Sequence, residues 1–75
     1  MPKFYFHVRN GNELIEDLEG MDLPNVVAAR AEAIQAARDI LAENLRFGGD
    51  LKGQIFEIWD KNGLIESVPF RDSLS

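Results

Sequence analysis

The chain contains one segment with helical periodicity, and this segment separates two stretches with strand periodicity. From Val26 onward, apolar residues recur at about 100° per residue and form one broad arc, with charged and amide side chains opposite. A single helix can cover only one face of a sheet, so we expect a second sheet face without a helix. The arc consists of Val26, Val27, Ala29, Ala33, Ile34, Ala36, Ala37, Ile40, Leu41 and Leu45.

The residues that flank this helix define its predicted ends. Pro24 disfavours the helical conformation for the residue before it, and Asn25 is well suited to cap the helix N-terminus. Gly48-Gly49 can close the C-terminus because glycine readily adopts the left-handed conformation. The helix is therefore about six turns long, and the residues from Asp50 to Gly53 form a connector.

A hairpin is predicted before the helix. Lys3 to Arg9 alternates with the period of a strand, Asn10-Gly11 supplies the positive φ angles of a tight turn, and Leu14-Ile15 lies in the returning strand. The alternation places Phe4, Phe6 and Val8 on one face and Tyr5, His7 and Arg9 on the other.

A second hairpin is predicted after the helix. Gln54 to Asp60 alternates again, and Asp60 to Gly63 has the composition of a type I turn with a bulge. Leu64 to Phe70 returns as the last strand and ends at Pro69, but the face that Ile65 takes stays open. The first of these strands places Phe56 and Ile58 on one face and Ile55, Glu57 and Trp59 on the other.

The expected fold is β-β-α-β-β in the α+β class: a four-stranded antiparallel sheet with one long helix packed on one face. Residues 1–75 form a single domain, and a domain of this size buries a thin core. The absence of cysteine removes disulfides as a means of stabilisation. Self-association is the other common way in which a domain with a thin core gains stability.

Several short runs in both halves of the chain carry a family resemblance. They are Phe6-His7-Val8-Arg9, Gly11, Asp17, Gly20, Leu23-Pro24, Ala28 to Ala33, Gly53, Phe56-Glu57, Asp60, Gly63 and Val68-Pro69-Phe70. They resemble a family of short alphaproteobacterial hypothetical proteins, classed as a domain of unknown function, with the pattern FHVRxG…DxxG…LP…AARAEA. Asn10 stands where that family usually has aspartate, which leaves the turn chemistry intact. The resemblance implies the fold and a bacterial origin, and it implies no activity, cofactor or site residue.

The charge and hydropathy of the chain limit its partners. A net charge of -5 disfavours nucleic acid and anionic membrane surfaces. No apolar run approaches the roughly 18 residues of a membrane span, and Met1-Pro2-Lys3 leads into a strand pattern instead of a signal-peptide core. We therefore expect a cytoplasmic protein.

The sequence contains no recognisable catalytic or metal-binding pattern. His7 is the only histidine, and Ser67, Ser73 and Ser75 lie near the C-terminus without a neighbouring base. The acidic residues lack the spacing of a calcium loop, so we expect a solvated acidic hairpin. We predict no enzymatic activity, no metal, no cofactor and no identifiable small-molecule substrate. The acidic residues are Glu13, Glu16, Asp17, Glu19 and Asp22.

Arg30 falls inside the apolar arc of the helix. A charged head at such a position either extends to the rim or pairs with a carboxylate. The carboxylate could come from a strand of the same chain, in a structural ion pair, or from a second chain across a dimer.

The sheet face without a helix is the candidate interaction surface. Aromatic residues and arginine mixed with a few polar groups are typical of interface centres. We expect homodimerisation or the docking of a protein partner on this face or at a strand edge, unless the C-terminal tail or side-chain stems cover the face. The alternative is a small regulatory, antitoxin-like protein that binds nucleic acid through Tyr5, His7, Arg9 and Trp59. The predicted surface consists of Tyr5, His7, Arg9, Ile55, Glu57 and Trp59.

Overall fold

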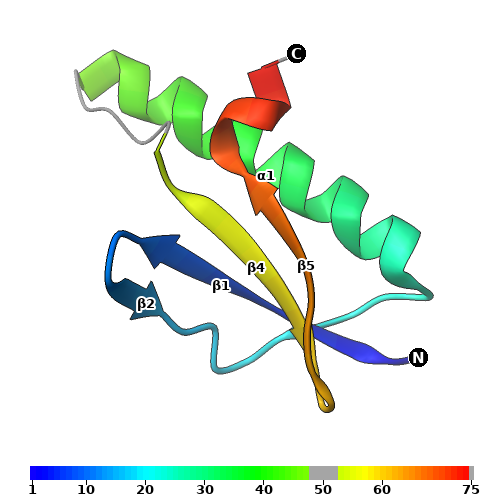
Figure 1. Cartoon of the computed structure of the whole chain (residues 1–75). Coiled ribbons are helices and arrows are strands. Elements are labelled where there is room, and N and C mark those ends of the chain that lie inside the picture. Colours follow the sequence, from blue (N-terminus) through cyan, green and yellow to red (C-terminus); the bar gives the residue numbers. More distant parts are fainter. Residues whose placement is uncertain (48–52, 75) are drawn as a thin grey trace.

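A computed structural model, which describes residues 1–47 and 53–74, shows an antiparallel sheet with one long helix across one face (Figure 1). This confirms the α+β class. Its elements are β1 (Lys3–Asn10), β2 (Glu13–Ile15), β3 (Met21–Asp22), α1 (Val26–Phe47), β4 (Ile55–Asp60), β5 (Gly63–Pro69) and a short C-terminal 3-10 helix, η1 (Phe70–Leu74).

The sheet has the order β2-β1-β4-β5, and β3 forms an additional pair with the start of β1. The prediction of four strands is therefore wrong by one strand. β3 pairs Met21 with Phe4 and Asp22 with Lys3 on the same edge as β2, and the N–H of Leu23 donates to the carbonyl oxygen of Pro2 at 3.0 Å. A strand of two residues is too short to produce a periodic pattern, which is why the sequence did not reveal it.

The first turn lies one residue later than predicted. Asn10 pairs with Glu13, so the loop consists of Gly11 and Asn12, and β1 extends to Asn10. Of these two loop residues, only Gly11 has a positive φ, at 63°. A two-residue loop with a positive φ at its first position alone has the pattern of a type II′ turn, in which glycine is favoured at that position.

The second turn lies where the sequence placed it, because Asp60 pairs with Gly63. The register then shifts: Ile58 pairs with Glu66 and Trp59 with Leu64, which leaves Ile65 as the extra residue of a bulge. Ile65 packs against the core. Its orientation, which the sequence left open, is therefore set by this bulge.

The core forms where an alanine stripe of α1 meets the sheet. Ala29, Ala33 and Ala37 are fully buried, and their small side chains let the helix lie close to β4 and β5. Val26 and Val27 are 38% and 78% exposed, so the predicted arc was too wide in the first helical turn. The stripe that meets the sheet begins at Ala29 and follows i, i+4 spacing. The core comprises Phe4, Ala29, Ala33, Ala37, Leu41, Phe56, Ile58, Val68 and Phe70.

The residues on either side of the helix were predicted to cap it at both ends. The Asn25 side-chain oxygen accepts a hydrogen bond from the N–H of Ala28 at 2.9 Å, which confirms the N-terminal cap. The expected helix end at Gly48-Gly49, the connector beginning at Asp50, and the side chain of Leu45 lie outside the described residues.

The C-terminal segment packs on the helix side of the sheet. η1 contacts α1, so the described part of the tail does not cover the opposite face (Figure 1). Ser73 is buried, and its Oγ donates to the carbonyl oxygen of Phe70 at 2.7 Å. The C-terminal segment is thus folded against the helix through residue 74. Within the described ranges, no helix has the length and apolarity needed to cross a membrane.

The close approach of α1 to the sheet makes the stripe intolerant of larger side chains. We expect Ala33→Leu to lower the free energy of unfolding by about 1–3 kcal/mol, because added methylenes overpack a filled core. Ala31→Leu, on the exposed side of the same helix, is the control and should change it by less than about 0.5 kcal/mol. Urea denaturation measures both. Equal effects of the two variants would contradict close packing at Ala33.

Candidate functional site

The six predicted surface residues all lie on the sheet face opposite α1. The pairing of β1 with β4 sets Tyr5 opposite Trp59, His7 opposite Glu57 and Arg9 opposite Ile55. Residues that face each other across an antiparallel pair point to the same side of the sheet. Two leucines join them by the same rule, since Leu14 pairs with Arg9 and Leu64 with Trp59. We call these eight residues the open face.

Three rings form a row across the open face. The ring centroids of Tyr5 and His7 are 6.2 Å apart with an interplanar angle of 29°, and those of His7 and Trp59 are 5.6 Å apart at 48°. Each of the three residues is partly exposed. The row therefore offers a continuous aromatic surface that the chain itself leaves half-covered.

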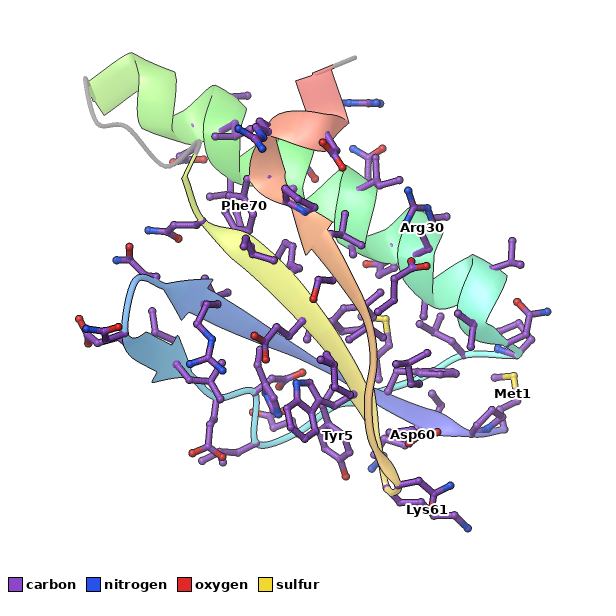
Figure 2. All side chains as sticks on the ribbon, in the orientation of Figure 1. Met1, Tyr5, Arg30, Asp60, Lys61 and Phe70 are labelled. Atoms are coloured by element: carbon purple, nitrogen blue, oxygen red, sulfur yellow. The ribbon has the colours of Figure 1, made fainter. Side chains whose placement is uncertain are left out.

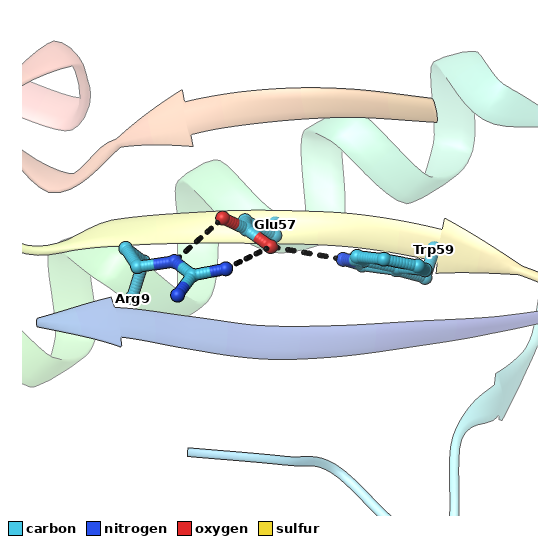
Figure 3. A network of polar contacts seen from close by, with 3 residues as sticks. All are labelled: Arg9, Glu57 and Trp59. Carbon is cyan, nitrogen blue, oxygen red and sulfur yellow. Dashed lines mark hydrogen bonds and ion pairs between the residues drawn. The ribbon is translucent and has the colours of Figure 1, made fainter. Parts of the chain in front are cut away.

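Glu57 lies at the centre of the open face and is only 9% exposed. Its Oε2 accepts a hydrogen bond from Nε of Arg9 at 2.9 Å, and its Oε1 accepts one from Nε1 of Trp59 at 3.0 Å (Figure 3). The hydrogen bond from Arg9 outweighs burial and lowers the pKa of Glu57. The carboxylate is thus ionised, and Arg9 neutralises it within the face.

Asp17 fills the gap between β2 and β3 along the edge of β1. Its Oδ2 accepts a hydrogen bond from the N–H of Phe6 at 3.2 Å, and its Oδ1 accepts from the N–H groups of Glu19 and Gly20, each at 3.2 Å. The carboxylate replaces the strand partner that β1 lacks at this point. The expectation of a solvated acidic hairpin is therefore wrong for Asp17, which satisfies backbone donors.

His7 forms a hydrogen bond with the same loop. Its Nδ1 accepts a hydrogen bond from the N–H of Asp17 at 2.9 Å, which ties the imidazole to the edge of the sheet. Among the described residues, no three histidine, cysteine, aspartate or glutamate side chains are grouped so that they could hold a metal ion. The hydrogen bond between His7 and Asp17 therefore holds the imidazole ring and the Asp17 loop in place.

Three neighbours of the predicted surface were not expected from the sequence: Leu14, Leu64 and Asp17. Leu64 is 52% exposed beside Trp59. Counting residue pairs outward from the Asp60–Gly63 turn would have placed Leu64 opposite Trp59. The bulge at Ile65 interrupts the alternation of the strand, so the sequence pattern did not show this. Asp17 has no comparable signal, because its contacts depend on how the loop folds back along β1.

Arg30 forms an ion pair on the other side of the sheet. Its Nη1 lies 2.7 Å from Oε2 of Glu66, and the two side chains are 46% and 34% exposed. Glu66 reaches the helix because its partner in the ladder, Ile58, points into the core. A pair with this exposure contributes little to folding, because solvent screens the charges.

We expect Asp17→Ala to lower the free energy of unfolding by about 1–3 kcal/mol at neutral pH, because three N–H groups lose their acceptor. Although burial opposes ionisation, the hydrogen bonds from Phe6, Gly20 and Glu19 lower the pKa of Asp17. This contribution is therefore complete above the ordinary carboxyl pKa, near 3.8, and is lost as the pH falls through the lower value in the folded protein.

Denaturation between about pH 7 and about pH 2 measures this dependence. The Asp17→Ala variant should lose less stability on acidification than the native chain does. Glu16→Ala removes a neighbouring exposed carboxyl group and is the control, with a profile parallel to that of the native chain. Parallel profiles for Asp17→Ala and the native chain would contradict the role of this carboxylate.

The chain was compared with known proteins and protein families. No curated protein and no solved structure matches it. A family model described as a domain of unknown function, DUF6894, matches residues 3–71, which include every strand of the sheet and the whole helix. The chain belongs to the family DUF6894.

Proposed function

We propose that this chain is a non-enzymatic interaction module that self-associates through the open face. The observation that carries the proposal is the aromatic row of Tyr5, His7 and Trp59, which is partly exposed and which no helix or strand of the described chain covers. Tyrosine, tryptophan and arginine are the residues enriched at the energetic centres of interfaces. Leu64 adds apolar area beside Trp59, and Leu14 adds apolar area beside Arg9.

The polar groups of the open face favour burial against another surface. Glu57 already has Arg9 and the Trp59 indole as partners, so covering the face leaves no unpaired charge at its centre. An unpaired buried charge is the feature that most strongly opposes association. The face can therefore be desolvated at a lower cost than the net charge of -5 suggests.

The two strand edges of the sheet offer weaker docking sites than the face does. On β5, the bulge at Ile65 and the proline at position 69 interrupt the ladder of free backbone groups. On the opposite edge, β2 and β3 are separate short strands, and Asp17 takes the intervening donor of β1. Strand addition therefore has no long regular edge to extend.

A second copy of the chain is the occupant that we propose. The core is thin and there is no cysteine, so association can supply burial that the monomer lacks. A two-fold interface would bring the same row against itself, with each Arg9 and Glu57 neutralised within its own chain.

Nucleic acid is the second interpretation of this face. Tyr5 and Trp59 could stack on bases, but Arg9 is already paired with Glu57, and the chain is acidic. Binding of DNA or RNA that weakens as salt increases would favour this interpretation over self-association.

We expect the native chain to dimerise and Leu64→Glu to prevent it. The leucine is 52% exposed in the monomer, so its replacement should leave the fold intact. A two-fold interface contains the change twice, and two losses of about 1.4 kcal/mol each weaken the dimer about 100-fold. Trp59 is a poorer target, because a carboxylate at that position would lie beside Glu57.

Light scattering across a range of protein concentrations measures the mass of each variant. Val27→Glu, which replaces a 78% exposed apolar residue on α1, is the control and should remain dimeric. Circular dichroism verifies that both variants fold. A native chain that stays monomeric throughout, or a Leu64→Glu variant that stays dimeric, would overturn the proposal.

A further inference from the structure

A pocket of about 270 Å³ lies where the start of β1 meets the β4–β5 turn. Figure 2 shows Tyr5, Asp60 and Lys61 together at this end of the sheet. The pocket therefore combines an aromatic wall with cationic groups, in a chain that is acidic as a whole. Its lining residues are Pro2, Lys3, Tyr5, Asp60 and Lys61.

The pairing of β1 with β4 brings two like charges to this pocket. Lys3 lies two residues before Tyr5 on β1, Lys61 lies in the turn that follows β4, and both lysines line the pocket. Like charges that line one pocket repel each other, and a bound anion reduces that repulsion. Among the described residues, neither lysine is in an ion pair, although Asp22 pairs with Lys3 across the ladder to β3.

The wall formed by β1 is held in place by Gly20. This glycine has a φ of 71°, and a Cβ at its position would lie 2.8 Å from Cγ of Lys3 and 2.9 Å from Cε1 of Tyr5. The loop that Asp17 anchors thus packs its backbone directly against the lysine stem and the tyrosine ring. The wall is formed before any ligand arrives, which lowers the entropic cost of binding.

We propose that this pocket binds a small carboxylate with a flat apolar body. The two lysines and Asp60 give the lining a net charge of one positive unit, which matches a monoanion. Oδ1 of Asp60 accepts the N–H of Asn62 at 2.8 Å, so this carboxylate is held at the turn. The ring of Tyr5 and the apolar surface of Pro2 would contact the flat body of the ligand, while the lysines contact its carboxylate.

Benzoate is the probe, and the amide resonances of the protein are the readout. We expect benzoate to shift the resonances of Lys3, Tyr5 and Lys61 in a saturable manner, with smaller shifts along α1. Benzamide has the same flat ring without the charge, acetate has the charge without the ring, and phenyl phosphate carries more charge. Each of the three should bind more weakly than benzoate.

Charge-removing variants test the role of the lysines. Lys3→Gln and Lys61→Gln should each weaken benzoate binding about five-fold, the effect of one charge contact in a solvated site. Arg71→Gln removes an exposed positive charge from η1 and is the matched control, with unchanged affinity. Both lysine variants should fold, because the two side chains are exposed.

Three outcomes would overturn this assignment: no saturable shift with benzoate, equal binding of benzamide, or equal affinity in the lysine variants and the native chain. If phenyl phosphate binds more tightly than benzoate, the ligand class is a phosphate ester and the carboxylate assignment is wrong. The benzoate experiment tests the pocket independently of the proposed dimer. Leu64→Glu should still bind benzoate, and Lys61→Gln should still have the mass of the native assembly.

Discussion

The pairing of β1 with β4 is the interaction on which the rest of the structure depends. These strands are distant in sequence, adjacent at the centre of the sheet, and joined over five residue pairs from Tyr5–Trp59 to Arg9–Ile55. One side of the pair supplies Phe6, Phe56 and Ile58 to the core, where they meet the helix. The other side forms the open face. A shift of register by one residue would exchange the two sets, so this pairing specifies the core and the surface together.

The open face combines an aromatic surface with polar groups that are already satisfied. Glu57 receives hydrogen bonds from Arg9 and Trp59, and the His7 imidazole is held by the N–H of Asp17. Such a network orients the rings and lowers the electrostatic penalty of covering them. The loop around Asp17 then has two functions in the structure, because it closes the edge of β1 and brings Gly20 against Tyr5.

Tyr5 links the open face to the lysine pocket. Its ring stacks near His7 on one side and lines the pocket with Lys3 and Lys61 on the other. A dimer formed over the face would therefore lie next to the pocket without requiring either lysine. The two sites therefore share the ring of Tyr5.

The sequence by itself determined the helix with its Asn25 cap, the two hairpins and the sides to which Tyr5, His7, Glu57 and Trp59 point, because periodicity and turn chemistry are local properties. Only the tertiary structure decided the contacts that depend on register. The bulge at Ile65 set Leu64 beside Trp59 and turned Glu66 toward Arg30. The short strand β3 and the role of Asp17 also required the folded chain, since both exist to satisfy donors and acceptors that β1 exposes at one edge. Local patterns specify which way a side chain points, whereas the partner that it meets depends on how distant segments align.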